Sequence, residues 1–466
     1  MAERKACFRI GYAATGDPLG WTKPLDQKME AAVRNLDCEL VRSSFVIDTV
    51  ESAAKAVREL RVNGVDLVLL RCNVLAGDGE IAAAFIKSGI PLAVWCVPEP
   101  TREGILYLNS MTCANLYMSV ANFNLRDLDA QVKWLYGAPD DPLFYSRLDV
   151  TVRALKAIKR MRGARIAQLG GSAFGFINME YDKAAFEKTL GCEILTQGLD
   201  EIYASARAMR EKEIADELAR FSRVPVASAV KPAEMDMSAR IILALRKYSR
   251  ENAIDAMAVS CWPGFQDELG VSSCMAYGQL NDEGHICACE GDVPGAISML
   301  LLESLSGRHP MIMDMVSMDR REDAMTFWHC GMGMPSYADS KGFSFIKYPA
   351  YPEIMDQPGV SVDMKFAPQP ATIIRLGGRG AESILISESD ILEGPDRSYT
   401  GARGWFGNFR MAGKAISAVD FWNTVCHCGN AHHYVISAGH VGDACMEFAH
   451  RMRIQPVETC EYHDYL

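Results

Sequence analysis

The chain has 466 residues, of which 49% are hydrophobic and 23% charged, and its formal net charge is −11. This length predicts roughly two to four domains. The negative charge and the lack of a basic stripe argue against nucleic-acid binding, which needs clustered Lys and Arg. No apolar run approaches the ~20 residues of a membrane-spanning helix, and no signal-peptide core follows the charged residues 1–5. We therefore expect a cytoplasmic protein with a small-molecule partner, and neither nucleic acid nor membrane.

The first part of the chain alternates strand-like and helix-like segments. Apolar runs at 8–13, 39–45, 65–72 and 90–96 are interleaved with amphipathic stretches at 25–36 and 50–63. Such alternation predicts a parallel sheet covered by helices on both faces. We expect an α/β domain of this kind over residues 1–160.

A second unit of the same kind follows. We expect strands at 165–169, 192–195 and 256–261 and helices at 183–189 and 231–251. This second domain spans 161–310. After residue 311 the apolar segments become short and are separated by Gly, Pro and Asp, which predicts antiparallel β structure over 311–466. The expected fold is therefore α/β, with two Rossmann-like parallel-sheet domains followed by a β-rich C-terminal domain.

Fifteen cysteines are present, and several lie in apolar, strand-like runs, including Cys72, Cys96, Cys261 and Cys289. A thiol in such a run behaves as a small buried hydrophobe. Together with the 24 Met residues, this favours a reducing cytoplasm over a disulfide framework.

Two weaker motifs have ordinary explanations. The glycine-rich loops at 170–176 and 376–380 do not match G-x-G-x-x-G, so a plain strand-to-helix turn is favoured over a phosphate loop. Cys426-His427-Cys428 has no second C-x-x-C pair, and neighbouring side chains of an extended segment point to opposite sides. We therefore do not expect structural zinc there, and His432 and His433 are better candidates for a catalytic ligand and its neighbour.

Two acidic islands and a histidine could meet around one cation. Glu268 lies in Gln266-Asp267-Glu268, Asp292 lies in Cys289-Glu290-Gly291-Asp292, and His433 is far downstream. Two carboxylates and one imidazole suit a divalent ion that keeps positions open for water or substrate. Each residue also has an ordinary explanation, and Asp292 in particular is well placed to cap a helix over 294–305. The two explanations of Asp292 do not exclude each other.

Three places in the chain resemble the L-fucose isomerase/L-arabinose isomerase superfamily. Residues 288–296 are similar to the Ala-Thr-Glu-Asn-Asp segment of that superfamily and the helix after it, and Glu268 precedes Asp292 by 292 − 268 = 24 positions. Ala431-His432-His433 is similar to a segment of arabinose isomerase. Residues 437–454 are similar to the C-terminal stretch of fucose isomerase.

The resemblance implies an aldose-ketose isomerase that acts on an open-chain sugar through an enediol. It implies that Glu268 and Asp292 bind Mn²⁺ or another divalent cation and move protons, and that His433 is the third ligand. It also implies a homo-trimer or homo-hexamer in which the N-terminal domain closes a neighbour's pocket. Candidate substrate contacts are Trp21, Trp95, Asn109, Trp262 and His329, of which His329 is equally well explained as a packed histidine.

Two alternatives stay open. An acidic sugar such as sulfoquinovose would suit the arginines of the third domain, Arg375, Arg379, Arg397 and Arg403, because a guanidinium pairs well with a sulfonate. A solvated surface explains the same arginines. Alternatively, the tandem α/β halves could form a non-catalytic sugar-binding protein, which would need no metal.

Overall fold

The computed structural model describes residues 7–16, 20–75, 78–100, 104–349, 358–394 and 399–463. The chain divides into two compact units, residues 1–155 and residues 156–466. Helix α5, Pro142–Met161, begins in the N-terminal unit and ends in the C-terminal unit. Among the residues described, no helix combines the length and the apolar character needed to cross a membrane.

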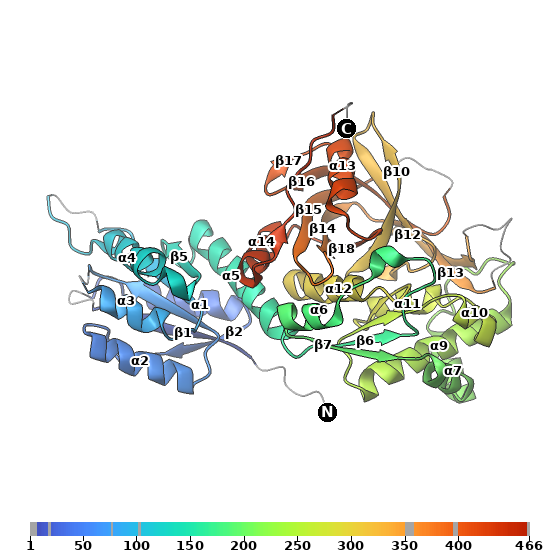
Figure 1. The fold of residues 1–466 in the computed structure, drawn as a ribbon, viewed down its shortest axis with the longest axis horizontal. Helices are drawn as coiled ribbons and strands as arrows, with labels where there is room; N and C mark the ends of the chain where they lie inside the picture. Colours follow the sequence, from blue (N-terminus) through green and yellow to red (C-terminus); the bar gives the residue numbers. More distant parts are fainter. Residues whose placement is uncertain are drawn as a thin grey trace. The chain divides into compact units, whose positions relative to one another are not determined.

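The N-terminal unit contains a five-stranded sheet in the order β2-β1-β3-β4-β5, in which every neighbouring pair is parallel (Figure 1). Its strands are β1 Phe8–Ala14, β2 Cys38–Arg42, β3 Leu67–Cys72, β4 Leu92–Cys96 and β5 Val132–Tyr136. Its helices before α5 are α1 Leu25–Asn35, α2 Val50–Val62, α3 Gly79–Ile86 and α4 Ser110–Ser119. Every residue of β3 and β4 is buried, as expected for strands that are covered on both faces.

The C-terminal unit starts with a four-stranded parallel sheet in the order β7-β6-β8-β9. Its strands are β6 Arg165–Leu169, β7 Glu193–Gln197, β8 Ala256–Val259 and β9 Ile286–Ala288. The helices of this part are α6 Lys183–Leu190, α7 Asp200–Arg207, α8 Glu211–Ala219, α9 Pro232–Glu251, α10 Gly264–Leu269, α11 Cys274–Asp282 and α12 Val293–Ser306.

The rest of the C-terminal unit is built around a ten-stranded sheet (Figure 1, yellow to red). Its strands are β10 Met311–Asp319, β11 Ala324–His329, β12 Ala338–Lys347, β13 Val360–Phe366, β14 Gln369–Gly377, β15 Ser383–Leu392, β16 Ala402–Met411, β17 Lys414–Ala415, β18 His433–Ala438 and β19 Gln455–Pro456. Its helices are α13 Ala418–Cys428 and α14 Gly442–Met452. Because β15 also pairs with β16, the strands β16-β11-β10-β18-β14-β15 close into an antiparallel ring. Closure leaves none of these strands as a free edge.

Helix α12 joins the two sheets of the C-terminal unit. It contacts β8 and β9 of the parallel sheet as well as β14 and β18 of the ten-stranded sheet. Nearly all its side chains are buried, as is typical of a helix that is apolar on every face. The N-terminus of α12 therefore lies where the two sheets meet, and that is where the candidate site is found.

The predicted fold class is confirmed: two parallel-sheet α/β parts precede a β-rich part. The second and third expected domains, 161–310 and 311–466, lie within one compact unit, since α12 is shared by both sheets. Cys426, His427 and Cys428 form the C-terminal end of α13 rather than an extended segment. This helix begins after Ser417, whose side chain caps its N-terminus.

Candidate functional site

The site is built on the tight turn between β9 and α12. Glu290 has a left-handed backbone conformation, with φ of 59°, and Gly291 follows with φ of 69°. The carbonyl oxygen of Glu290 accepts a hydrogen bond from the Ala173 amide at 2.9 Å. A Cβ atom at Gly291 would collide with the carbonyl oxygen of Gly171, so only glycine fits there. The glycine-rich loop at 170–176 thus supports this turn.

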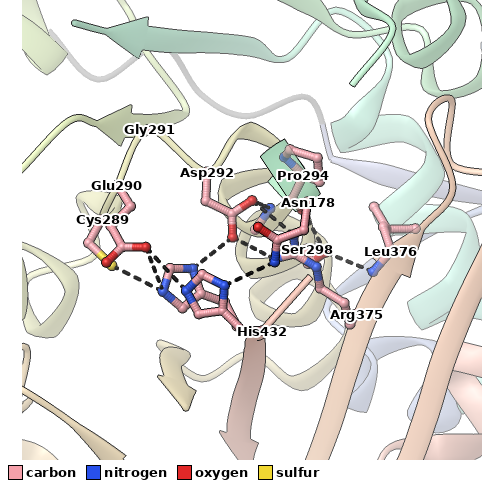
Figure 2. Close-up of polar contacts among 12 residues, drawn as sticks. Asn178, Cys289, Glu290, Gly291, Asp292, Pro294, Ser298, Arg375, Leu376 and His432 are labelled. Carbon is pink, nitrogen blue, oxygen red and sulfur yellow. Dashed lines mark hydrogen bonds and ion pairs between the residues drawn. The ribbon is translucent and has the colours of Figure 1, made fainter. Parts of the chain in front are cut away.

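Glu290 points at His432, which directly precedes β18 (Figure 2), and also lies near His433, the first residue of that strand. Its Oε2 lies 3.2 Å from Nε2 of His432 and 3.6 Å from Nε2 of His433. The other ring nitrogen of His432 is 3.2 Å from the Asn178 side-chain amide, and the ring of His432 packs against Phe176. These contacts aim one carboxylate and two imidazoles at a common point, and together they could hold a metal ion.

A second carboxylate comes from the neighbouring strand. Asp314 of β10 is the direct cross-strand partner of His433. Its Oδ1 lies 3.8 Å from Nε2 of His433 and is buried without a hydrogen-bond partner in the described part of the chain. Buried polar atoms are normally paired, so this carboxylate oxygen is available to a ligand.

Asp292 contacts the other ring nitrogen of His433, Nδ1. Its carboxylate receives two hydrogen bonds from Arg375, at 2.6 Å and 2.9 Å, and one from Nδ1 of His433 at 3.0 Å. It also caps α12 through the Gly295 amide. In Figure 2, the Asp292 side chain has Arg375 on one side and Glu290 on the other.

The pKa of Asp292 follows from these contacts. Burial alone would raise it, but the charge of Arg375 and the hydrogen bonds from His433 and Arg375 outweigh burial, so the pKa lies well below its ordinary value. An ionised carboxylate only accepts hydrogen bonds, so Nδ1 of His433 carries the proton. The lone pair on Nε2 of His433 is then free to bind a metal.

Glu290 and His432 shift each other's pKa in opposite directions. Burial raises the pKa of Glu290, yet its hydrogen bond to His432 and the nearby histidines lower it below the ordinary value. Burial lowers the pKa of His432, but the hydrogen bond to Glu290 and nearby carboxylates raise it overall. Glu290 is therefore ionised at neutral pH and is paired with an imidazole that readily carries a proton.

A sulfur and a third histidine lie next to His433. Sγ of Cys289 is 3.2 Å from Nε2 of His329 and 3.6 Å from Nε2 of His433, and all three residues are buried. Their ligand atoms also lie close enough to hold a metal ion. The other ring nitrogen of His329 is 3.4 Å from Sγ of Cys330. Burial lowers the pKa of His329, but Cys330 and nearby carboxylates raise it to about 9.

The structure brings Asp292, His433 and His329 together but does not bring Glu268 to them. Glu268 lies on α10, where its half-exposed carboxylate pairs with Arg207 at 2.9 Å. Glu290 and Asp314 are not among the site residues expected from the sequence, whereas His432 was expected as the neighbour of a catalytic ligand. A carboxylate inside the apolar run 311–316 is the signal that could have pointed to Asp314.

Of the other expected substrate contacts, three belong to the N-terminal unit and one to the C-terminal unit. Trp95 is fully buried in the core of the N-terminal unit, where its indole donates a hydrogen bond to the Gly137 carbonyl oxygen. In the same unit, Trp21 packs against Tyr107, and the backbone amide of Asn109 donates to Glu99. Trp262 lies in the segment between β8 and α10 of the C-terminal unit.

The three expected anion-binding arginines that the structure describes in the β-rich part pair with different carboxylates. Arg375 is buried against Asp292, and Arg403 pairs with Asp363 at 2.6 Å. Arg379 is exposed and has a long contact of 3.5 Å with Glu180. Arg397 lies outside the described residues.

Curated relatives of this chain carry one activity in their names. A sulfoquinovose isomerase of Alkalicoccus urumqiensis is 33% identical over 263 residues, which is 56% of this chain and 58% of that protein. The match thus spans less than two thirds of that relative. Sulfoquinovose isomerases of Priestia megaterium and of Clostridium sp. strain MSTE9 are 24% and 26% identical and match 88% and 96% of this chain, and 89% and 98% of their own lengths.

The chain is similar to sugar isomerases. This similarity supports an enzyme of the isomerase class. No family model matches the chain. A solved galactofuranose binding protein matches 65% of this chain and 90% of its own at 15% identity, but with a TM-score of only 0.18, so it carries no argument for a binding protein.

Proposed function

We propose that this protein is a metal-dependent aldose-ketose isomerase that acts on an open-chain sulfonated sugar of the sulfoquinovose class. The observation that carries the proposal is that Glu290 and Asp314 both approach Nε2 of His433 near the N-terminus of α12. The names of its curated relatives support the reaction and the substrate. Membership of the fucose/arabinose isomerase superfamily agrees with this proposal and stays a prediction.

The side chains fit a divalent cation. Nε2 of His433 lies 3.6 Å from a Glu290 oxygen and 3.8 Å from the unpaired Asp314 oxygen, so each carboxylate lies within reach of an ion bound by this nitrogen. Two carboxylates and one imidazole suit Mn²⁺, which we propose as the physiological ion. When bound, such an ion polarises a carbonyl and stabilises the negative charge of an enediol.

The protein's own groups then have distinct tasks. Glu290, ionised and next to the sugar, would move the proton between C1 and C2. His432 would hold a proton at Nε2 and exchange it with a sugar hydroxyl. Asp292 and Arg375 would keep the proton of His433 on Nδ1. The metal-binding roles expected for Glu268 and Asp292 would thereby pass to Glu290 and Asp314, and the proton transfers would pass to Glu290 and His432.

A pocket next to His432 could receive the sulfonate. It has a volume of about 240 Å³ and is lined by Asn178, Arg379 and Asn430, among others. The Asn178 amide also contacts His432, which joins this pocket to Glu290. Both amide atoms of Asn430 are buried without a partner among the described residues. Arg379 is exposed and its ion pair with Glu180 is long, so this pair contributes little to stability. Its guanidinium could therefore turn to a sulfonate at a small cost in free energy.

Arg379→Met should therefore raise KM for a sulfonated hexose by ~10- to 100-fold, which corresponds to loss of one charge-assisted hydrogen bond. Arg379→Met should leave turnover of any neutral sugar unchanged. The control Arg321→Met, in the exposed turn after β10, should leave the kinetics with both sugar classes unchanged. Steady-state kinetics on both sugar classes measure the difference. An equal loss on neutral and sulfonated sugars would show that Arg379 does not recognise the anion.

The proposed activity is tested by a substrate screen with and without metal. Protein treated with EDTA should be inactive, and added Mn²⁺ should restore isomerisation of sulfonated hexoses more than that of neutral pentoses or 6-deoxyhexoses. Full turnover after chelation would contradict the metal, and tight sugar binding without turnover would favour the sugar-binding alternative.

Light scattering would test the proposed homo-trimer or homo-hexamer. We propose a reducing, cytoplasmic location, in agreement with the lack of disulfide bonds among the described cysteines.

A further inference from the structure

Two cysteines from distant segments bring their sulfur atoms together in the C-terminal unit. Cys274 is the first residue of α11, and Cys330 directly follows the end of β11. Both thiols are free, and their Sγ atoms lie 3.9 Å apart although the residues are 330 − 274 = 56 positions apart in the chain. The fold therefore places two reduced sulfur atoms in contact.

The backbones around the two thiols are close enough for a covalent link. A Cβ atom at Gly331, next to Cys330, would lie only 2.7 Å from Cβ of Cys274, so the segment after β11 packs directly on the start of α11. A disulfide bond is about 2.05 Å long, so the two sulfur atoms would have to approach by about 1.9 Å. Rotation of the two side chains about χ1 can supply a movement of that size, because it swings each Sγ around its Cβ.

Packing and weak hydrogen bonds also explain the resting position of these thiols. Sγ of Cys330 lies 3.4 Å from Nδ1 of His329 as well as near Cys274. The exposure of the pair goes beyond what packing requires. Cys330 is partly exposed, whereas Cys274 is 5% exposed. A partly exposed thiol can meet a small oxidant, and a second thiol in contact with it can convert the oxidised sulfur to a disulfide.

We propose that Cys274 and Cys330 are a site of reversible oxidation, at which hydrogen peroxide produces an intramolecular disulfide. The thiolate of Cys330 attacks one peroxide oxygen, the O–O bond breaks, and the sulfur becomes a sulfenic acid. The hydroxide that leaves takes up the proton that the thiol lost. The thiol of Cys274 then attacks the sulfenic sulfur, the S–O bond breaks, and water leaves as the S–S bond forms. Two thiols and one peroxide thus give one disulfide and two water molecules.

The disulfide would act on the candidate site through one contact. Cys330 also contacts His329, so the link would draw its sulfur away from a histidine of that site. Oxidation should therefore lower the isomerase activity, and a thiol reductant should restore it. This consequence, unlike the disulfide itself, rests on the proposed function. In a reducing compartment such a link is transient, as is typical of redox-sensing disulfides.

Peptide mapping tests the disulfide directly. Full-length protein is treated with stoichiometric hydrogen peroxide, alkylated, and digested with trypsin and a glutamate-specific protease. Residues 269–283 should then be recovered linked to residues 323–341, and each of these peptides contains a single cysteine, Cys274 or Cys330. Prior treatment with a thiol reductant should abolish the linked pair. Its absence from folded, peroxide-treated wild type overturns the proposal.

Cys274→Ser gives a second test that does not depend on recovering a linked pair. This variant lacks the resolving thiol, so peroxide should leave Cys330 as a sulfenic acid that a dimedone probe labels, and labelling should exceed that of the wild type. Equal labelling of the two proteins would show that Cys274 does not resolve the oxidised sulfur. The control Cys428→Ser changes another partly buried thiol, at the end of α13, and should keep the linked pair.

Turnover assays separate this site from the proposed function. An inactive protein that forms the linked pair supports the oxidation site, whatever the reaction of the enzyme. An active protein that never forms the pair refutes the oxidation site alone. Unchanged turnover of fully linked protein would refute its effect on the candidate site.

Discussion

Glu290→Gln should lower metal-dependent isomerisation by ~10²- to 10⁴-fold while the protein stays folded, because the neutral amide can neither take up the proton nor hold the cation as well. Gln has nearly the same shape, so the left-handed turn before α12 is retained. Steady-state turnover of the sulfonated sugar with saturating Mn²⁺ measures the loss. Urea unfolding checks that stability is kept.

Glu268→Gln is the matched control. Glu268 lies on the surface and pairs with Arg207, and an exposed ion pair contributes at most about 1 kcal/mol. Its activity should equal that of the wild type. If Glu268→Gln were inactive and Glu290→Gln active, the proposed site at the N-terminus of α12 would be refuted. The role of Glu268 that was expected from the sequence would then be restored.

Asp292→Asn should destabilise the protein by about 3–5 kcal/mol, because it leaves the buried guanidinium of Arg375 without a counter-charge. Removing both charges in Asp292→Asn with Arg375→Met should cost less than the sum of the two single changes. Urea unfolding of the four proteins gives this coupling. Strict additivity would mean that the two side chains do not stabilise the fold as a pair.

The effect of Asp292→Asn also has a defined pH dependence. The folded-state pKa of Asp292 is held well below the unfolded value of about 3.9, so its contribution is complete above that pH and is lost as the pH falls toward the folded pKa. The stability gap between wild type and Asp292→Asn should therefore be constant between about pH 5 and 8 and should shrink below about pH 4. A gap that closes at neutral pH would contradict the ionised pair.

Much of the fold could be predicted because the local patterns agree with the packing. The strand at 165–169 and the helix at 231–251 both carry clear periodicity and end signals, and the structure has β6 at Arg165–Leu169 and α9 at Pro232–Glu251. The helix α12 could be predicted from the sequence, but the two sheets that pack against it could not. Only the packing of two sheets against one helix reveals that the second and third expected domains form one unit.

The site was only partly predictable, since several carboxylates have equivalent spacing. Glu290 and Asp314 are 314 − 290 = 24 positions apart, the same separation as Glu268 and Asp292. Sequence cannot choose between the pairs, because the choice depends on which strand lies opposite His433. Asp292 contacts His433, but its oxygens are used by Arg375, His433 and the α12 cap.

The pairing of β10 with β18 also bears on how the protein matures. Asp314 and His433 are brought together by strands whose partners are separated by more than a hundred residues, so closing this loop has a large entropic cost until the ring of strands forms. During synthesis a nascent chain lacks the imidazole of His433 until β18 has emerged. If the protein binds the proposed cation, capture of the ion would therefore be a late event, which could stabilise the finished C-terminal unit but could not guide its early assembly.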